Sequence, residues 1–187
     1  MSIVNLPESI ETARLLLRKV RREDAQGIFD TYAQDKSVTH YLSWTPHQRV
    51  DETRQFINHT RRMWVQGLEF TYLICLKDQD TIVGSLGVLH DNGKVSVGYL
   101  AVPAYQRRGF VCEGLAALLP HLVASKGVYR IWAYAHVDNV ASQALLKKLG
   151  FVYEGTIKRW ARFPNLPEPA CDCSFYYYPY KGTDLIR

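Results

Sequence analysis

This chain contains few cysteines and no long hydrophobic run. Only four of the 187 residues are cysteines, and none has the CxxC or Cys/His spacing of a zinc site. The longest candidate apolar run, residues 115–124, contains Pro120 and His121 and is far too short to cross a bilayer. The N-terminus lacks the basic and apolar parts of a signal peptide. We therefore expect a cytoplasmic protein with no disulfide framework, no metal site and no membrane segment.

Low complexity and disorder are also excluded. The 12 glycines and 8 prolines show no repeat period, and 47% of the residues are hydrophobic. Disordered chains combine low hydrophobicity with high net charge. A chain of this length suits one domain with its own core, and we expect a single domain over residues 1–187.

The charge is modestly basic. There are 23 Lys and Arg against 18 Asp and Glu, a net charge of +5. The densest basic groups are scattered along the chain, at Arg18-Lys19 with Arg21-Arg22, Arg61-Arg62, Arg107-Arg108 and Lys147-Lys148. A nucleic-acid footprint is more often a stripe or a tail. A positive electrostatic field attracts phosphorylated small molecules as well as nucleic acid. Because the basic groups are scattered, we expect no direct nucleic-acid binding.

The hydrophobic period changes along the chain. Helical spacing runs from Ala25 to Tyr32 and from Phe56 to Trp64, and returns at residues 109–126 and from 138 or 139 to 148. Strand-like segments are residues 14–18, 70–76, 81–89, 94–102, 129–135, 151–154 and 174–178. Asn92-Gly93 is a strong hairpin signal, so the middle third is predicted to be an antiparallel meander. The order predicts one mixed α/β (α+β) domain.

A predicted strand-to-helix junction at residues 102–111 is a candidate anion site. The first turn of a helix has unpaired N–H groups and the positive end of the helix dipole. Gly109 permits a close backbone approach, and Arg107 and Arg108 add positive charge. The segment suits a pyrophosphate; the alternative is a solvated basic turn that caps a helix.

A second cluster begins at Asn139. From the residues alone, Asn139 is most simply an N-cap and Ser142 a residue of the first helical turn. Spacing alone assigns neither of them to catalysis.

Together these segments resemble the GNAT N-acetyltransferase superfamily. Residues 106–111, Gln-Arg-Arg-Gly-Phe-Val, resemble its acetyl-coenzyme A loop, Q/R-x-x-G-x-G/A. Asn139 to Ser142, with residues 148–151 and Glu154-Gly155, resemble its N-x-x-S…K-L-G-F…E-G segment. Residues 12–18 and 41–44 are similar to the branch of ribosomal-protein alanine N-acetyltransferases. The resemblance covers residues 10–180 and implies a mostly antiparallel mixed sheet, with a parallel splay between middle strands and about four flanking helices.

The resemblance also implies roles for particular residues, with acetyl-coenzyme A as co-substrate. Amides of residues 107–111 would hold the pyrophosphate, and a backbone N–H from residues 100–102 would stabilise the oxyanion. Asn139 would bind the pantetheine chain or cap the helix beside it, and Ser142 would protonate the leaving thiolate. The residues implied at the cofactor are Leu100, Ala101, Val102, Arg107, Arg108, Gly109, Phe110, Val111, Asn139 and Ser142.

The chain departs from the family pattern at three positions. Val111 replaces the last small residue of the loop, Ser96 stands where many relatives have Glu, and Leu146 matches a frequent leaving-group Tyr. The candidates for the general base are Glu69, Asp172, His40, His47 and His136. The resemblance favours Asp172, because it places a similar Asp at the start of the last strand.

The leading hypothesis is therefore acetyl transfer to a primary amine by direct attack. The acceptor would be a protein N-terminus or a small molecule, with the loops at residues 41–47 and 164–169 flanking its entrance. The alternatives are a coenzyme A-binding regulatory module without catalysis, or a ribosome- or nucleic-acid-associated binding protein. The resemblance leaves a homodimer open.

Overall fold

The computed structural model describes residues 4–77 and 79–180, and its eight strands form one sheet in the order β1-β2-β3-β4-β5-β6-β8-β7. The strands are β1 (Ser9–Glu11), β2 (Leu15–Lys19), β3 (Glu69–Leu76), β4 (Ile82–Asp91), β5 (Lys94–Ala101), β6 (Arg130–His136), β7 (Val152–Ala161) and β8 (Cys171–Tyr177). The α-helices are α1 (Ala25–Ile28), α2 (Lys36–Thr39), α3 (Val50–Val65), α4 (Phe110–Val123) and α5 (Val140–Lys148). A π-helical turn (Phe29–Ala33) continues α1, and 3-10 turns precede α1 (Arg22–Asp24) and α4 (Pro103–Tyr105).

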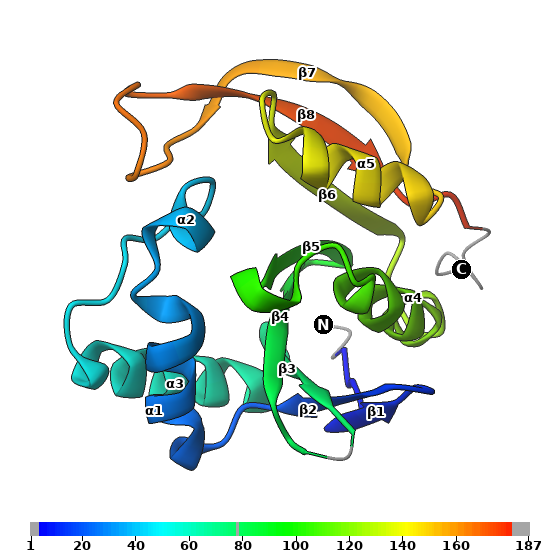
Figure 1. Cartoon of the computed structure of the whole chain (residues 1–187). Helices are drawn as coiled ribbons and strands as arrows, with labels where there is room; N and C mark the ends of the chain where they lie inside the picture. The colour runs from blue at the N-terminus through cyan, green and yellow to red at the C-terminus, as the bar shows by residue number, and fades with distance from the viewer. Residues whose placement is uncertain (1–3, 78, 181–187) are drawn as a thin grey trace.

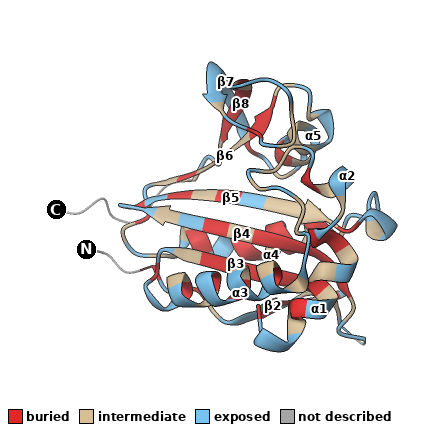
Figure 2. Ribbon diagram, turned by 90° about the vertical axis from the view of Figure 1, so that its left-hand side faces the viewer, coloured by how far each residue is buried: buried red, intermediate tan, exposed pale blue. Residues whose placement is uncertain are grey.

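The helices cover both faces of the sheet. One cluster packs α1 and α3 on β3 through Ile28, Ile57 and Leu73. A second and larger cluster lies under α4, where Leu115 and Leu118 are fully buried among strand residues. Figure 2 shows β3 and β4 as the most deeply covered strands, as expected for strands with helices on both faces.

The sheet divides between β5 and β6. Their parallel pairing covers only three positions, Lys94–Ser96 against Arg130–Trp132. Beyond Ser96 no pairing joins them, and β6, β8, β7 and α5 form a separate lobe of the sheet (Figure 1). The predicted parallel splay within a mostly antiparallel sheet is confirmed.

The predicted meander is confirmed as well. β3, β4 and β5 pair antiparallel in sequence. Asn92 and Gly93 both have positive φ, 47° and 85°, as a type I′ hairpin turn requires.

The predicted boundaries of the last two strands were wrong. The segment predicted at 151–154 is the ten-residue β7, and the last strand begins at Cys171, not Ser174. β7 is an edge strand, exposed along nearly its whole length, so it carries no alternation of buried and exposed residues. β1 and α2 were also missed, because each has only a few residues. The single-domain prediction for residues 1–187 includes 1–3, 78 and 181–187, which lie outside the described residues.

Candidate active site

A cleft of about 530 Å³ opens where β5 separates from β6. Its walls come from α2 and the segment after it, from the end of β5, from the start of α4 and from α5. The lining residues are Ser37, Val38, Tyr41, Leu42, Tyr99, Leu100, Ala101, Tyr105, Gln106, Arg107, Gly109, Phe110, Val111, Cys112, Asn139, Ala141, Ser142, Ala144, Leu145 and Lys148. The cleft therefore brings together the two segments that the sequence singled out.

The loop before α4 presents a run of free amides. Within the described residues, none of the backbone N–H groups of residues 107–112 donates to a protein acceptor, and the first bond of the helix is Glu113 N to Gly109 O, 2.9 Å. Arg107 and Gly109 are left-handed, with φ of 61° and 79°. Amides around left-handed residues at a helix N-terminus form a concavity that binds anions.

Val111 does not obstruct this loop. Its side chain is buried in the core beneath α4, only 6% exposed. The branched side chain therefore points away from the amides, and its replacement of a small residue leaves the backbone approach open.

Strand β5 presents backbone groups to the open side of the splay. Val102 N donates to Val83 O on the β4 side, 3.0 Å. Since backbone groups alternate along an antiparallel ladder, Leu100 also faces β4, whereas Tyr99 and Ala101 face the side that β6 has left. Of the residues 100–102 that were predicted to offer a free N–H, only Ala101 therefore faces the splay. Val102 is buried, does not line the cleft, and its amide already donates to Val83 O.

Asn139, Ser142 and Tyr99 meet at the start of α5. Asn139 caps the helix, its Oδ1 accepting from Ser142 N at 3.1 Å. Ser142 Oγ lies 2.8 Å from the phenolic oxygen of Tyr99, which also contacts Ser142 O at 3.1 Å. Burial raises the pKa of Tyr99 to about 12, so the phenol is protonated at neutral pH. Sequence reasoning missed Tyr99, because its partner is 43 positions away. Leu146, which matches the frequent leaving-group Tyr of the family, is fully buried in the core.

Asp172 lies outside the cleft lining. Its carboxylate accepts from Lys158 Nζ at 2.7 Å and from Arg159 N at 2.9 Å. The hydrogen bond from Lys158 is the main cause that lowers the pKa of Asp172. The structure shows an ion-paired carboxylate here, and its role as the base stays a prediction.

His136 lies between Tyr41 of the cleft and Phe163 of the β7–β8 loop. Its ring stacks on Tyr41, which lines the cleft, at a centroid distance of 5.0 Å, and meets Phe163 edge-on at 5.4 Å. His136 Nδ1 accepts the amide of Asp138 at 3.1 Å. A neutral His136 therefore carries its proton on Nε2 and is a donor there.

The other candidates for the general base do not line the cleft. His47 bonds Thr53 Oγ1 at 2.8 Å, and burial lowers the pKa of His47. Glu69 is 3.6 Å from His59, and His40 packs edge-on against Tyr41 at 4.5 Å.

The two loops predicted at the acceptor entrance are tied together. Asn165 Nδ2, in the β7–β8 loop, donates to Thr39 O at 2.6 Å and to Trp44 O at 2.8 Å. This contact joins the β6-β8-β7 lobe to the segment after α2, beside the stack of Tyr41, His136 and Phe163.

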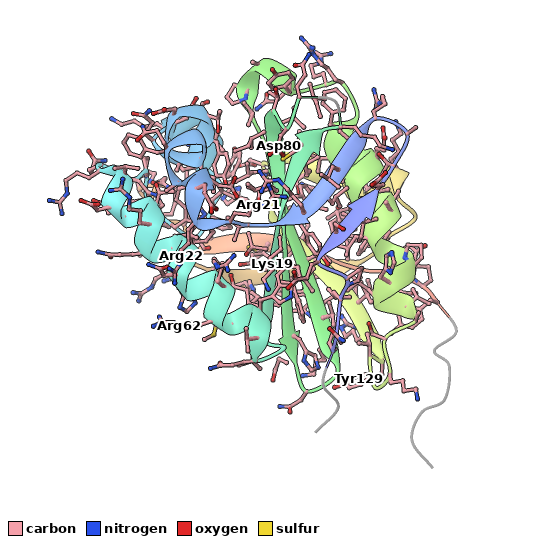
Figure 3. The ribbon with its side chains drawn as sticks, turned by 90° about the horizontal axis from the view of Figure 1, so that it is seen from below. Lys19, Arg21, Arg22, Arg62, Asp80 and Tyr129 are labelled. Atoms are coloured by element: carbon pink, nitrogen blue, oxygen red, sulfur yellow. The ribbon has the colours of Figure 1, made fainter. Side chains whose placement is uncertain are left out.

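Two basic groups that are distant in sequence come together on the underside of the molecule, away from α5. Figure 3 shows Lys19, Arg21, Arg22 and Arg62 around the end of β2 and along α3. Several are neutralised: Lys19 pairs with Glu8 at 2.5 Å, and Arg21 lies 3.8 Å from Asp80.

The described residues include neither a helix that could span a membrane nor a cluster of metal ligands. No helix there is long and apolar enough to cross a bilayer. No three His, Cys, Asp or Glu side chains there are grouped as a metal site would require.

Comparison with known proteins identifies the family. The model of the acetyltransferase (GNAT) domain matches residues 14–152, which include β2 to α5 and the whole loop before α4. The chain belongs to this family.

Individual relatives agree with this assignment. An uncharacterized N-acetyltransferase, p20, of Bacillus licheniformis is 29% identical over 83% of this chain and 88% of its own. The [ribosomal protein uS5]-alanine N-acetyltransferase of Escherichia coli is 28% identical over 82% of this chain and 84% of its own. Among solved structures, RimL, a ribosomal L7/L12 alpha-N-protein acetyltransferase in complex with coenzyme A, has a TM-score of 0.81 at 22% identity, covering 91% of this chain and 97% of its own.

Proposed function

We propose that this chain transfers an acetyl group from acetyl-coenzyme A to a primary amine, either a protein N-terminus or a small molecule. The observation that carries the proposal is the run of free amides at residues 107–112, which opens into a cleft continuous with the splay beyond Ser96. A long ligand with a pyrophosphate in its middle and a thioester at one end suits this shape. The similar RimL structure is a complex with coenzyme A.

Each wall of the cleft has a task in this proposal. The amides of residues 107–112 bind the pyrophosphate, helped by the positive end of the α4 dipole. The free backbone groups of Tyr99 and Ala101 bind the pantetheine arm as an added strand would. Bound there, acetyl-coenzyme A supplies an activated acetyl group. The N–H of Ala101 is the donor for the negative charge that develops on the carbonyl oxygen.

The leaving sulfur receives a proton from the pair of Tyr99 and Ser142. The single phenolic hydrogen of Tyr99 can go to Ser142 O or to Ser142 Oγ. When it goes to the closer Oγ, the Ser142 hydroxyl hydrogen is free to point into the cleft. The amine nitrogen forms a bond to the carbonyl carbon, the C–S bond breaks, and Ser142 protonates the sulfur. Tyr99 then reprotonates Ser142 and regains its own proton from solvent, which also takes up the proton that the amine loses. This pair supplies the function that a Tyr at position 146 has in other family members.

The amine must lose a proton before or during attack. His136 is a donor at Nε2 when neutral, so it suits binding a carbonyl of the acceptor better than removing a proton. Asp172 stays our prediction for the base. An Asp172→Asn variant that retains full turnover over the whole pH range would exclude it.

The first test is ligand-dependent stability. A hundredfold excess of acetyl-coenzyme A over its Kd adds about 2.7 kcal/mol to the free energy of unfolding. For a chain of this size, the Tm rises by about 5–10 °C. Release of free thiol with a panel of primary amines then identifies the acceptor. Binding without any thiol release would favour the regulatory module over the enzyme.

A further inference from the structure

We propose that Arg14 is a positioning residue that holds the anion-binding loop in its binding shape, with Glu113 as its anchor. Arg14 lies just before β2, nearly 100 positions from the loop. Its Nη1 and Nη2 each lie 3.3 Å from Arg108 O, and its Nε donates to Glu113 Oε2 at 2.7 Å. The guanidinium also lies over the Phe110 ring, 4.7 Å from its centroid. One side chain thus contacts three parts of the loop–helix junction.

Glu113 is held from the same segment. Its Oε1 accepts from Thr12 Oγ1 at 2.6 Å and from Arg14 N at 3.2 Å. Burial alone raises the pKa of Glu113, but the hydrogen bonds from Thr12 and Arg14 outweigh it and lower the pKa overall. Glu113 is therefore ionised at neutral pH. It lies one turn into α4, close to the free amides, where an uncompensated negative charge would repel an anion.

The contact with Arg108 O explains how Arg14 acts on the amides. The C=O and the following N–H of a trans peptide point in opposite directions. By holding Arg108 O on its own side, Arg14 directs the Gly109 N–H to the other side. Arg108 lies between the two left-handed residues Arg107 and Gly109, so this peptide is the one whose rotation would most easily disrupt the concavity.

The contacts are too exposed to serve mainly the stability of the fold. The Arg14 side chain is 50% exposed, and exposed ion pairs contribute little to stability. We therefore expect Arg14 substitutions to alter the loop and its ligand far more than the free energy of unfolding.

The experiment compares Arg14→Gln and Arg14→Lys with the control Arg22→Gln. Arg22 is exposed, lies on the underside of the molecule and makes no contact with the loop (Figure 3). NMR order parameters of the backbone amides of the ligand-free protein report the loop itself, because the amides of residues 107–112 have no protein acceptor among the described residues whose loss hydrogen exchange could detect. Calorimetry with coenzyme A, which has the pyrophosphate, and with pantetheine, which lacks it, reports the consequence for binding.

In Arg14→Gln, we expect lower order parameters confined to residues 107–113, a Kd for coenzyme A raised about tenfold, and no change in the Kd for pantetheine. Arg14→Lys keeps the charge but loses the fork that reaches Arg108 O and Glu113 together, so it should behave like Arg14→Gln. Unchanged order parameters in the loop, or an equal loss of affinity for both ligands, would overturn the proposal.

Glu113→Gln separates positioning from simple charge. If Glu113 mainly anchors Arg14, the variant raises the Kd for coenzyme A although it removes a nearby negative charge. Tighter binding would contradict the anchoring role. The cofactor part of the inference rests on the proposed function: wild-type protein that binds no coenzyme A would refute that function, whereas the order parameters would still decide whether Arg14 holds the loop.

Discussion

The phenolic oxygen of Tyr99 lies 2.8 Å from the hydroxyl of Ser142, inside the cleft where β5 leaves β6. Strand β5 and helix α5 each contribute one member of this pair. The contact gives Ser142 a protonated neighbour, and the proposed proton transfer requires that Tyr99 be the donor of this hydrogen bond.

Ser142→Ala and Tyr99→Phe should each lower kcat about 10- to 100-fold. This loss is at or below the low end of general-acid effects, because a thiolate is a good leaving group even without a proton donor. The KM for acetyl-coenzyme A should change little. Steady-state kinetics with Tyr129→Phe, a half-exposed tyrosine outside the cleft, provides the control. Full turnover in both cleft variants would exclude the pair as the proton donor.

The same pair predicts a feature of the pH profile. The folded-state pKa of Tyr99 is raised to about 12 by burial, so the phenol keeps its proton as the pH rises through the neutral and mildly alkaline range. No loss of kcat from Tyr99 ionisation is expected until the pH approaches that value. A wild-type loss of kcat near pH 9 that Tyr99→Phe abolishes would contradict this assignment.

Gly109→Ala tests the left-handed turn before α4. Gly109 has a φ of 79°, and an added Cβ would meet no atom closer than 3.7 Å. The penalty is therefore conformational, about 1 kcal/mol, and it is relieved if the peptide rotates away from the binding shape. We expect a slightly lower Tm and a smaller Tm increase with coenzyme A. The control is Gly87→Ala, where a Cβ would meet only Gly98 O at 4.0 Å.

Local patterns predicted the core of the fold well. The hairpin at Asn92-Gly93 and the helix beginning at residue 110 follow from turn chemistry and from helical spacing of apolar residues. A strand was predicted at residues 151–154, but the full length of the edge strand β7 was not, because its exposed side chains do not alternate between buried and exposed. The loop before α4 could be predicted as a candidate anion site, because a helix start of that kind is formed by consecutive residues.

The rest of the site depends on contacts between distant segments. Tyr99 reaches Ser142, Arg14 reaches Arg108, and Asn165 reaches Thr39 only once the chain has folded. Among the predicted cofactor residues, the alternation of the β4–β5 ladder assigns Ala101 to the splay and Val102 to the neighbouring strand. That distinction depends on the pairing register, which residue types do not specify.

Asn165→Ala tests the connection between the two acceptor-side loops. The variant removes hydrogen bonds to Thr39 O and Trp44 O, so both segments should exchange backbone hydrogens faster and be cleaved sooner by protease. We expect the KM for the amine to rise about three- to tenfold, with the KM for acetyl-coenzyme A unchanged. An equal change in both KM values would show that the contact supports the whole cleft. Asn5, far along the sequence in the N-terminal segment, offers a matched Asn→Ala control.

Arg18→Met tests the ion network that Arg18 forms with Asp24 and Asp80. Arg18 is only 4% exposed and bonds both carboxylate oxygens of Asp24 at 2.8 Å and Asp80 at 2.8 and 3.1 Å. The hydrogen bond to Asp24 is the main cause that raises the pKa of Arg18, so the guanidinium is charged at every accessible pH. Removing it leaves the charge of the largely buried Asp24 without its guanidinium, with the backbone N–H of Arg21 at 2.6 Å still in place. We expect the free energy of unfolding to fall by about 3–5 kcal/mol, measured by urea denaturation.

Asp80 adds a pH dependence to this network. Its hydrogen bond from Arg18 lowers the pKa of Asp80 below the ordinary 3.8. A depressed carboxyl pKa stabilises the fold above the unfolded-state pKa, and that contribution is lost as the pH falls through the folded-state value. Wild-type stability should therefore decline below about pH 4, and Arg18→Met should lose this part of the decline. Since Asp80 is half exposed, its share is small. Parallel acid-limb slopes in the two proteins would show that Arg18 does not control the ionisation of Asp80.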